Sequence, residues 1–244
     1  MSPSCRLVEG EELDGLAADD PRGRRSRRDL QRVHIAMRSV SNLRRAVAAL
    51  QFAVQPRRIL ELGAGDGTLL LRFARAQRPR WNDVELTLLD RVDLVSGQTR
   101  AAYRELGWQV NFLRADALEW AASPQTRRYD LCFANLFLHH FESAPLALLL
   151  RAVAAATDAF VACEPRRSNA ARFGSRLIVL LGANDVTRQD AVKSVAAGFT
   201  DRELSAAWNT AGGDWNLVEF SALPFSHCLA ATCKSRLSTT ATEK

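Results

Sequence analysis

The chain has 244 residues, 47% hydrophobic and 25% charged, with a formal net charge of +6. This composition is globular, and it excludes a disordered chain, a collagen-like repeat and a small disulfide-stapled fold. No stretch of about 18 residues lacks charge, and no basic patch precedes an apolar run, so we expect neither a membrane span nor a signal peptide. Five cysteines without a CxxC pair favour a cytoplasmic protein and argue against a zinc site.

The N-terminal part of the chain is predicted to be a helical extension, residues 1–54. Residues 1–25 form a polar lead-in, and from Ser26 onward apolar residues recur at three- and four-residue steps. This spacing predicts one amphipathic helix, or two with a break near residues 39–41, ended by Pro56. The basic charge lies in residues 21–58, which hold eleven arginines and a single acid. A solvated helix face is the simpler interpretation, and RNA, anionic lipid or an acidic substrate is the alternative.

Beyond Pro56 the hydrophobic period changes, and short buried strands alternate with helices. The expected strands are residues 57–62, 84–90, 109–115, 129–135 and 159–163, followed by a hairpin of residues 215–222 and 225–233. The expected helices are residues 68–76, 94–106, 118–122, 143–156 and 172–181. This alternation predicts a doubly wound α/β fold, whose ligand lies at the carboxyl ends of the strands.

A glycine-rich turn follows the first predicted strand, in the sequence ELGAGDG at residues 61–67. Glycine lets the backbone turn sharply and approach a ligand without a Cβ in the way. The spacing is GxGxG, which differs from the GxGxxG of dinucleotide-binding proteins. A phosphate-binding P-loop is excluded, because no Gly-Lys-Ser/Thr follows.

Two acids stand at the ends of the next two predicted strands. Asp90 ends the second strand, where a carboxylate can accept hydrogen bonds from both hydroxyls of a ribose. Asp116 ends the third strand, where its carboxylate can accept a hydrogen bond from the exocyclic amine of an adenine. The alternative for both is a structural role, as a helix cap at Asp90 and as a turn former at Asp116.

The glycine turn and the two acids together resemble the class I S-adenosylmethionine-dependent methyltransferases, over residues 55–235. The resemblance implies a seven-stranded Rossmann-like sheet with a terminal antiparallel hairpin. The composition of residues 236–244 predicts a polar tail. The resemblance also implies that the glycines lie under the amino-acid end of the cofactor, with the glutamate beneath the turn and the acids at the ribose and the adenine. The implied cofactor residues so far are Glu61, Gly63, Gly65, Gly67, Asp90, Asp116 and Ala117.

The segment NLFLHHF at residues 135–141 follows the fourth predicted strand. It resembles the LHHF stretch of ubiquinone/menaquinone-type methyltransferases, which implies that Asn135 and Leu136 lie along the cofactor. His139 and His140 are candidate bases for a phenol or an enol, and the alternative for each is packing or helix capping. Adjacent histidines on a helix point in different directions, so we expect no metal site.

Two further segments are expected near the acceptor. After the fifth strand, Glu164 and Arg166 are within reach of an acceptor pocket, and the arginine fork suits a phenolate, carboxylate or quinone oxygen. The alternative for Arg166 is a surface position. Residues 182–200 with residues 226–228 resemble a subgroup of bacterial methyltransferases that accompanies type III polyketide synthases, which implies phenolic lipid acceptors. Together with the N-terminal helix, residues 182–200 would cover the acceptor pocket.

These observations predict an S-adenosylmethionine-dependent O-methyltransferase that releases S-adenosylhomocysteine and acts on a phenolic or quinone-precursor compound. C-methylation of a similar ring is the first alternative. An RNA or protein methyltransferase is a further alternative, although no RNA-binding module and no Asn-Pro-Pro-Tyr motif is evident. A non-catalytic cofactor-binding protein is the last. We expect a small aromatic acceptor as partner, with nucleic acid disfavoured and a homodimer possible in principle. His227, Trp208 and Trp215 are expected to be structural.

Overall fold

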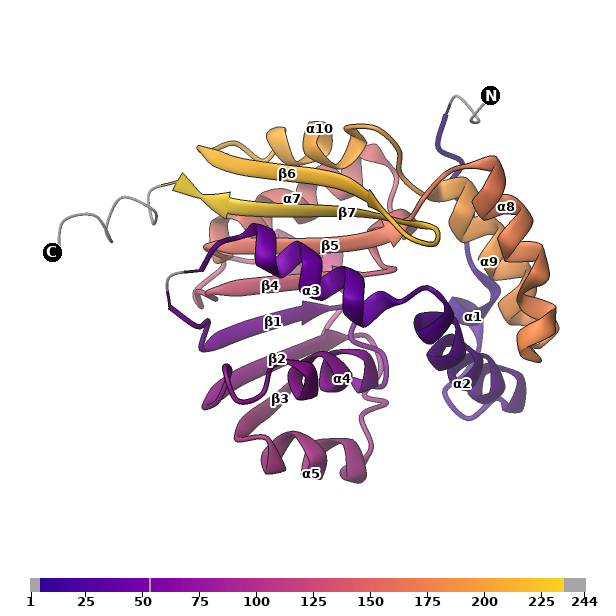
Figure 1. Cartoon of the computed structure of the whole chain (residues 1–244), viewed down its shortest axis with the longest axis horizontal. Helices are drawn as coiled ribbons and strands as arrows, with labels where there is room; N and C mark the ends of the chain where they lie inside the picture. Colours follow the sequence, from indigo (N-terminus) through magenta and orange to yellow (C-terminus); the bar gives the residue numbers. More distant parts are fainter. Residues whose placement is uncertain (1–4, 53, 235–244) are drawn as a thin grey trace, which may run out of the picture.

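The computed structural model describes residues 5–52 and 54–234, and its centre is a seven-stranded sheet in the order β3-β2-β1-β4-β5-β7-β6 (Figure 1). The strands are β1 Arg58–Leu62, β2 Val84–Asp90, β3 Trp108–Arg114, β4 Leu131–Asn135, β5 Ala159–Pro165, β6 Trp215–Ala222 and β7 Ser226–Cys233. β1 to β5 pair in parallel, and β7 is antiparallel to both of its neighbours. This confirms the doubly wound sheet and its terminal hairpin, and it puts the switch in strand order between β1 and β4.

Helices cover both faces of the sheet, because successive residues of each buried strand point to opposite sides. One face packs against α3 Ser39–Ala49, α4 Thr68–Gln77 and α5 Gly97–Glu105 (Figure 1). The other face packs against α6 Ala117–Ala122, α7 Ser143–Ala156 and α10 Glu203–Asn209. The alternation is visible within β1, where Ile59 joins the first core and Leu60 the second.

A third group of elements lies beyond the carboxyl ends of the parallel strands (Figure 1). They are α1 Glu12–Gly15, α2 Pro21–Ala36, η1 Leu138–His140, α8 Asn169–Arg176, η2 Leu177–Leu181 and α9 Asp185–Ala197. We call α1, α2, α8, η2 and α9 the cap. The cap therefore stands at the sheet edge where ligands of doubly wound folds bind.

The structure corrects the expected N-terminal lead-in. The first long helix begins at Pro21 rather than near Ser26, because the Asp20 carboxylate accepts the Arg22 N–H at 2.7 Å and proline suits the first helical position. Ser26 is instead buried, and its hydroxyl lies 2.7 Å from that of Thr187. The predicted interruption of the helix is present one residue earlier, at Arg38, whose φ is 53°.

The region after α8 also differs from expectation. Residues 182–200 were expected to be a long polar segment, but they contain α9, and α10 was not predicted at all. α9 lacks an apolar stripe that a sequence pattern would reveal, since its buried residues include Thr187 and Asp190. Two of the expected structural residues are confirmed: Trp208 is fully buried, and His227 is buried against Glu219 with 2.7 Å between Nε2 and Oε1.

No helix within residues 5–52 and 54–234 is long and apolar enough to cross a membrane. The polar tail expected at residues 236–244 lies outside the described residues.

Candidate active site

The glycine turn joins β1 to α4, and all three of its glycines have a positive φ. A Cβ on Gly63 would stand 2.2 Å from the Phe137 ring, and one on Gly67 would stand 3.2 Å from Leu88. A Cβ on Gly65 would meet nothing within 4 Å. Gly63 is therefore required by the packing of the protein itself and Gly67 is in close contact with Leu88, whereas Gly65 leaves open space that a ligand can enter.

Asp90 connects the end of β2 to this turn. Its Oδ2 accepts the Gly65 N–H at 2.9 Å, and its Oδ1 accepts the Val92 N–H at 3.2 Å. The residue is half-buried, and each carboxylate oxygen has a second lone pair. The structure thus brings Asp90, the predicted ribose-binding residue, into direct contact with the glycine turn. The carboxylate can still accept further hydrogen bonds from a ligand.

Asp116 stands next along the same edge, since the Ala115 N–H donates to the Asp90 carbonyl at 3.1 Å. Its Oδ1 caps α6 by accepting the Leu118 N–H at 2.8 Å. No hydrogen bond of the described residues involves its Oδ2. One oxygen of Asp116 therefore has a structural role as a helix cap, which differs from the turn-forming alternative, and the other oxygen is left for a ligand. Ala117 is buried, with 5% of its surface exposed.

Two buried polar atoms near the turn have no hydrogen-bond partner in the described residues: Oε2 of Glu61 and Nδ2 of Asn135. Burial, with the charges of Asp66 and Asp90, raises the pKa of Glu61 well above its usual value. Leu136 follows Asn135 with a φ of 50°, a costly conformation for a non-glycine residue. An unpartnered amide and an unpartnered carboxyl oxygen, both buried, fit a ligand that carries polar groups of its own.

Glu164 at the end of β5 organises the histidine segment. This fully buried carboxylate accepts the backbone N–H groups of Phe137 at 3.1 Å and Leu138 at 2.9 Å. It also lies 2.8 Å from Nδ1 of His139. Glu164 therefore holds the start of η1 and directs the opposite ring nitrogen of His139 away from β5.

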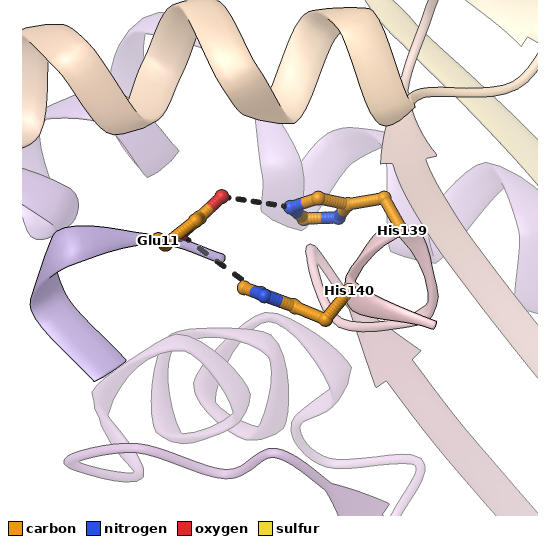
Figure 2. Close-up of side chains that lie close together, drawn as sticks. All are labelled: Glu11, His139 and His140. Atoms are coloured by element: carbon orange, nitrogen blue, oxygen red, sulfur yellow. Dashed lines mark hydrogen bonds and ion pairs between the residues drawn. The ribbon is translucent and has the colours of Figure 1, made fainter. Parts of the chain in front are cut away.

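The two histidine rings converge, with 4.3 Å between their centroids and 31° between their planes. The expectation that adjacent histidines point in different directions is therefore wrong, because they lie in a short 3₁₀ turn held by Glu164 and not in an α-helix. Figure 2 shows both rings facing Glu11 of the N-terminal segment. The distances are 3.3 Å from Glu11 Oε1 to His139 Nε2, and 4.0 Å from Glu11 Oε2 to His140 Nε2.

The protonation of the two histidines differs. Burial by itself would lower the pKa of His139, but the hydrogen bonds and charges of Glu11 and Glu164 outweigh it and raise the pKa to about 9. Burial and the neighbouring His139 charge lower the pKa of His140. Glu11 has a lowered pKa, since its contacts with both histidines outweigh its burial.

Glu11 belongs to a segment, residues 5–16, that we call the N-terminal strap. The strap is fastened to α9, where Asp190 accepts the Glu12 and Leu13 N–H groups at 2.8 and 3.0 Å. The next residue, Asp14, lies 3.1 Å from Arg91, which directly follows Asp90. The strap thus crosses the carboxyl edge from α9 to the end of β2. Sequence analysis missed Glu11, because a single acid in an acidic lead-in carries no local signal of its distant partners.

The two arginines after β5 lie in different environments. Arg166 is exposed, and its backbone N–H donates to the Phe225 carbonyl at 2.7 Å. Arg167 is buried and pairs with Glu203 of α10. The contacts of the described residues do not bring Arg166 to the histidine pair, so its acceptor role has no structural support.

Residues 59–158 match a protein family described as a methyltransferase domain. A search of curated protein sequences found no match. Among solved structures, the plantazolicin methyltransferase BpumL in complex with SAH has a TM-score of 0.61 at 17% identity, covering 88% of this chain and 91% of that one.

Two further solved structures are larger than this chain. An O-methyltransferase family protein from Burkholderia thailandensis has a TM-score of 0.55 at 18% identity, covering 88% of this chain and 61% of that one. The pyocyanin biosynthetic protein PhzM has a TM-score of 0.57 at 19% identity, covering 92% of this chain and 62% of that one. This chain thus spans less than two thirds of either protein. At these identities the likeness concerns the fold.

Proposed function

We propose, from the premise that this chain carries a class I S-adenosylmethionine-dependent methyltransferase domain, that it methylates a small-molecule acceptor at an aromatic hydroxyl oxygen. The observation that supports this most directly is the junction between the glycine turn and the histidine segment. The Phe137 ring lies against Gly63, and its centroid is 6.3 Å from that of His140. The Phe137 ring therefore lies between the turn, where the cofactor would bind, and His140, which could accept a proton from the substrate.

The residues at the turn supply what the cofactor requires. Gly65 offers open backbone, Asp90 and Asp116 offer carboxylate lone pairs, and Glu61 and Asn135 offer the unpaired polar atoms. When bound, S-adenosylmethionine supplies a methyl group already activated by its sulfonium. The task left to the protein is to align the acceptor, exclude water and take up a proton. The strap, which lies over this edge, is suited to excluding water.

His140 is the proposed proton acceptor. Both ring nitrogens of His139 are engaged, at 2.8 Å by Glu164 and at 3.3 Å by Glu11, whereas the carboxylates near His140 stand at 3.4 and 4.0 Å. His140 therefore keeps a nitrogen for the acceptor hydroxyl. A bound cofactor would supply the methyl group to the acceptor oxygen, and His140 would take up the proton that this hydroxyl loses. A phenol with a pKa near 10 needs such a base at neutral pH.

The proposal is tested first by calorimetric titration with S-adenosylmethionine and S-adenosylhomocysteine, and then by incubation with phenols. Product analysis distinguishes the two chemistries, because an O-methyl ether loses an exchangeable hydroxyl and a C-methylated ring retains it. Micromolar cofactor binding followed by ether formation would support the proposal. A C-methylated product would replace the oxygen acceptor by the ring carbon, and no cofactor binding would refute catalysis.

We expect Asp90→Ala to lower cofactor affinity at least about tenfold, or about 1.4 kcal/mol. The variant loses the proposed ribose contact and also the hydrogen bond that orients the Gly65 N–H. Calorimetry measures the affinity, and Glu85→Ala at the opposite end of β2 is the matched control. Unchanged affinity in Asp90→Ala, with an intact fold by circular dichroism, would contradict the ribose assignment.

An apolar patch on the cap supports an acceptor with a hydrocarbon part, such as a phenolic lipid. Large apolar side chains are exposed along α8 and η2: Phe173, Leu177, Val179, Leu180 and Leu181. Leu180 is 80% exposed. Such a concentration on two consecutive elements is more than the scattered surface leucines of ordinary proteins.

We expect Leu180→Asp to lower kcat/KM about tenfold for a long-chain alkylphenol and to leave the value for a short-chain phenol unchanged. The reason is the loss of apolar contact with the chain, which is worth about 0.8 kcal/mol for each buried methylene group. Leu223→Asp is the matched control, since Leu223 is 73% exposed in the turn between β6 and β7. Equal effects on both substrates, or on both variants, would refute a role of the patch in acceptor binding.

A further inference from the structure

Three potential metal ligands meet where the N-terminal strap crosses η1. Glu11, His139 and His140 each offer one ligand atom, and these atoms all lie within 4.8 Å of one another. Figure 2 shows the carboxylate of Glu11 facing both imidazoles. The ligands come from segments 128 residues apart in the chain, so the tertiary fold creates the cluster.

The ring nitrogens are arranged as in a metal centre. His139 turns Nε2 toward Glu11 at 3.3 Å, while its Nδ1 lies 2.8 Å from Glu164. His140 repeats the pattern, with Nε2 at 4.0 Å from Glu11 and Nδ1 at 3.4 Å from Asp14. Histidines that ligate a metal commonly pair the second ring nitrogen with a carboxylate, which sets the tautomer and the ring orientation.

The spacing of the ligands also suits a cation. Tetrahedral zinc with ligands at about 2.0–2.1 Å separates neighbouring ligand atoms by about 3.4 Å. The 3.3 Å between His139 Nε2 and Glu11 Oε1 matches this value, whereas the 4.0 Å between His140 Nε2 and Glu11 Oε2 has to shorten when a metal binds. Other contacts already hold the strap, including the bonds from Asp190 to the backbone of α1, so Glu11 is positioned without a metal.

A plain histidine–glutamate hydrogen bond is the simpler interpretation, and the chain contains one for comparison. His227 Nε2 lies 2.7 Å from Glu219 Oε1 in a closed pair of one imidazole and one carboxylate. The strap cluster differs in two respects. One carboxylate faces two imidazoles and also accepts the Ser194 hydroxyl, and its 4.0 Å distance to His140 Nε2 exceeds the length of a hydrogen bond, which leaves room between these two groups.

We propose that Glu11, His139 and His140 bind a divalent transition-metal cation of the Zn²⁺ class, with Glu164 and Asp14 orienting the two imidazoles. Two imidazoles with one carboxylate suit Zn²⁺, Co²⁺ or Ni²⁺ better than Mg²⁺ or Ca²⁺, which prefer oxygen ligands alone. Three protein ligands leave one coordination position open. The inference goes beyond the proposed function. A bound cation would occupy the nitrogen of His140 that is proposed to accept the proton, so His140 would act as the base only in the metal-free protein.

The test uses untagged, full-length protein freed of metal with a chelator that is then removed. Co²⁺ is titrated first, because its visible absorption bands report tetrahedral coordination, and Zn²⁺ affinity is then measured by competition with a chromophoric chelator. We expect one equivalent per chain. Glu11→Gln and His139→Ala should each lower the Zn²⁺ affinity at least about 100-fold, and Asp14→Asn about tenfold.

Matched controls separate the site from general metal binding. Glu12→Gln changes the neighbouring acid and His34→Ala a histidine of α2, and both should bind Zn²⁺ like the unaltered chain. Absence of stoichiometric binding, or binding that survives Glu11→Gln, would overturn the proposal. Thermal unfolding checks that each variant is folded. Because this readout requires neither cofactor nor methyl transfer, failure of the metal proposal is distinct from failure of the proposed function.

Discussion

Turnover is expected to fall about 10²–10⁴-fold when His140 is replaced by alanine, the usual range for loss of a general base. Cofactor affinity should stay within about twofold, because the glycine turn and Asp90 do not depend on the His140 side chain. Steady-state kinetics with a phenolic acceptor measures the first quantity, and calorimetry with S-adenosylhomocysteine measures the second. Both are measured on chelator-treated protein, so that metal occupancy does not enter the comparison.

His139→Ala tests the role of the neighbouring histidine. It removes the partner of Glu164, so we expect it to lower turnover by disturbing η1 and the orientation of His140, again without loss of cofactor binding. His34→Ala is the control for a histidine on another element and should leave turnover unchanged. If neither His139→Ala nor His140→Ala changes turnover, the base does not come from this pair.

Gly63→Ala is expected to destabilise the protein by about 2–5 kcal/mol. A residue with a Cβ at the observed φ of 63° costs about 1–2 kcal/mol, and overpacking of a filled site costs about 1–3 kcal/mol more. The new Cβ would stand 2.2 Å from the Phe137 ring, near its attachment to the chain, so the ring cannot simply swing aside. Urea unfolding measures the change in the free energy of unfolding.

Gly65→Ala is the matched substitution in the same turn. Its φ of 56° carries a similar backbone cost, but the added Cβ meets nothing within 4 Å, so destabilisation should be limited to about 1–2 kcal/mol. The larger effect of Gly65→Ala should be on cofactor affinity, which we expect to fall because the added methyl group occupies the open space. Equal destabilisation of the two variants would contradict the packing role assigned to Phe137.

Most of the sheet was predictable from the sequence. β2, α7 and β6 have the predicted bounds, and β1 and α4 differ by one residue. These elements are governed by local hydrophobic period and by glycine or proline at their ends, which act over a few residues. The start of α2 and all of α9 were harder to predict, because their buried residues include Asp29, Thr187 and Asp190, whose partners lie far away in the chain.

The sequence by itself determined which residues reach the carboxyl edge of the sheet. A glycine turn or an acid that directly follows a parallel strand must lie there, since right-handed crossovers align every such strand end. Asp90, Asp116 and the turn at residues 61–67 were located in this way, and the structure joins Asp90 to Gly65.

Only the tertiary structure decided what these residues face. It distinguished the open glycine from the two packed ones, put Arg166 on the surface and Arg167 inside, and brought Glu11 across the edge to the histidine pair. Each of these outcomes depends on contacts between segments that are distant in sequence. Local sequence preferences do not predict such contacts, because the contacts contribute free energy only when the separate elements pack together.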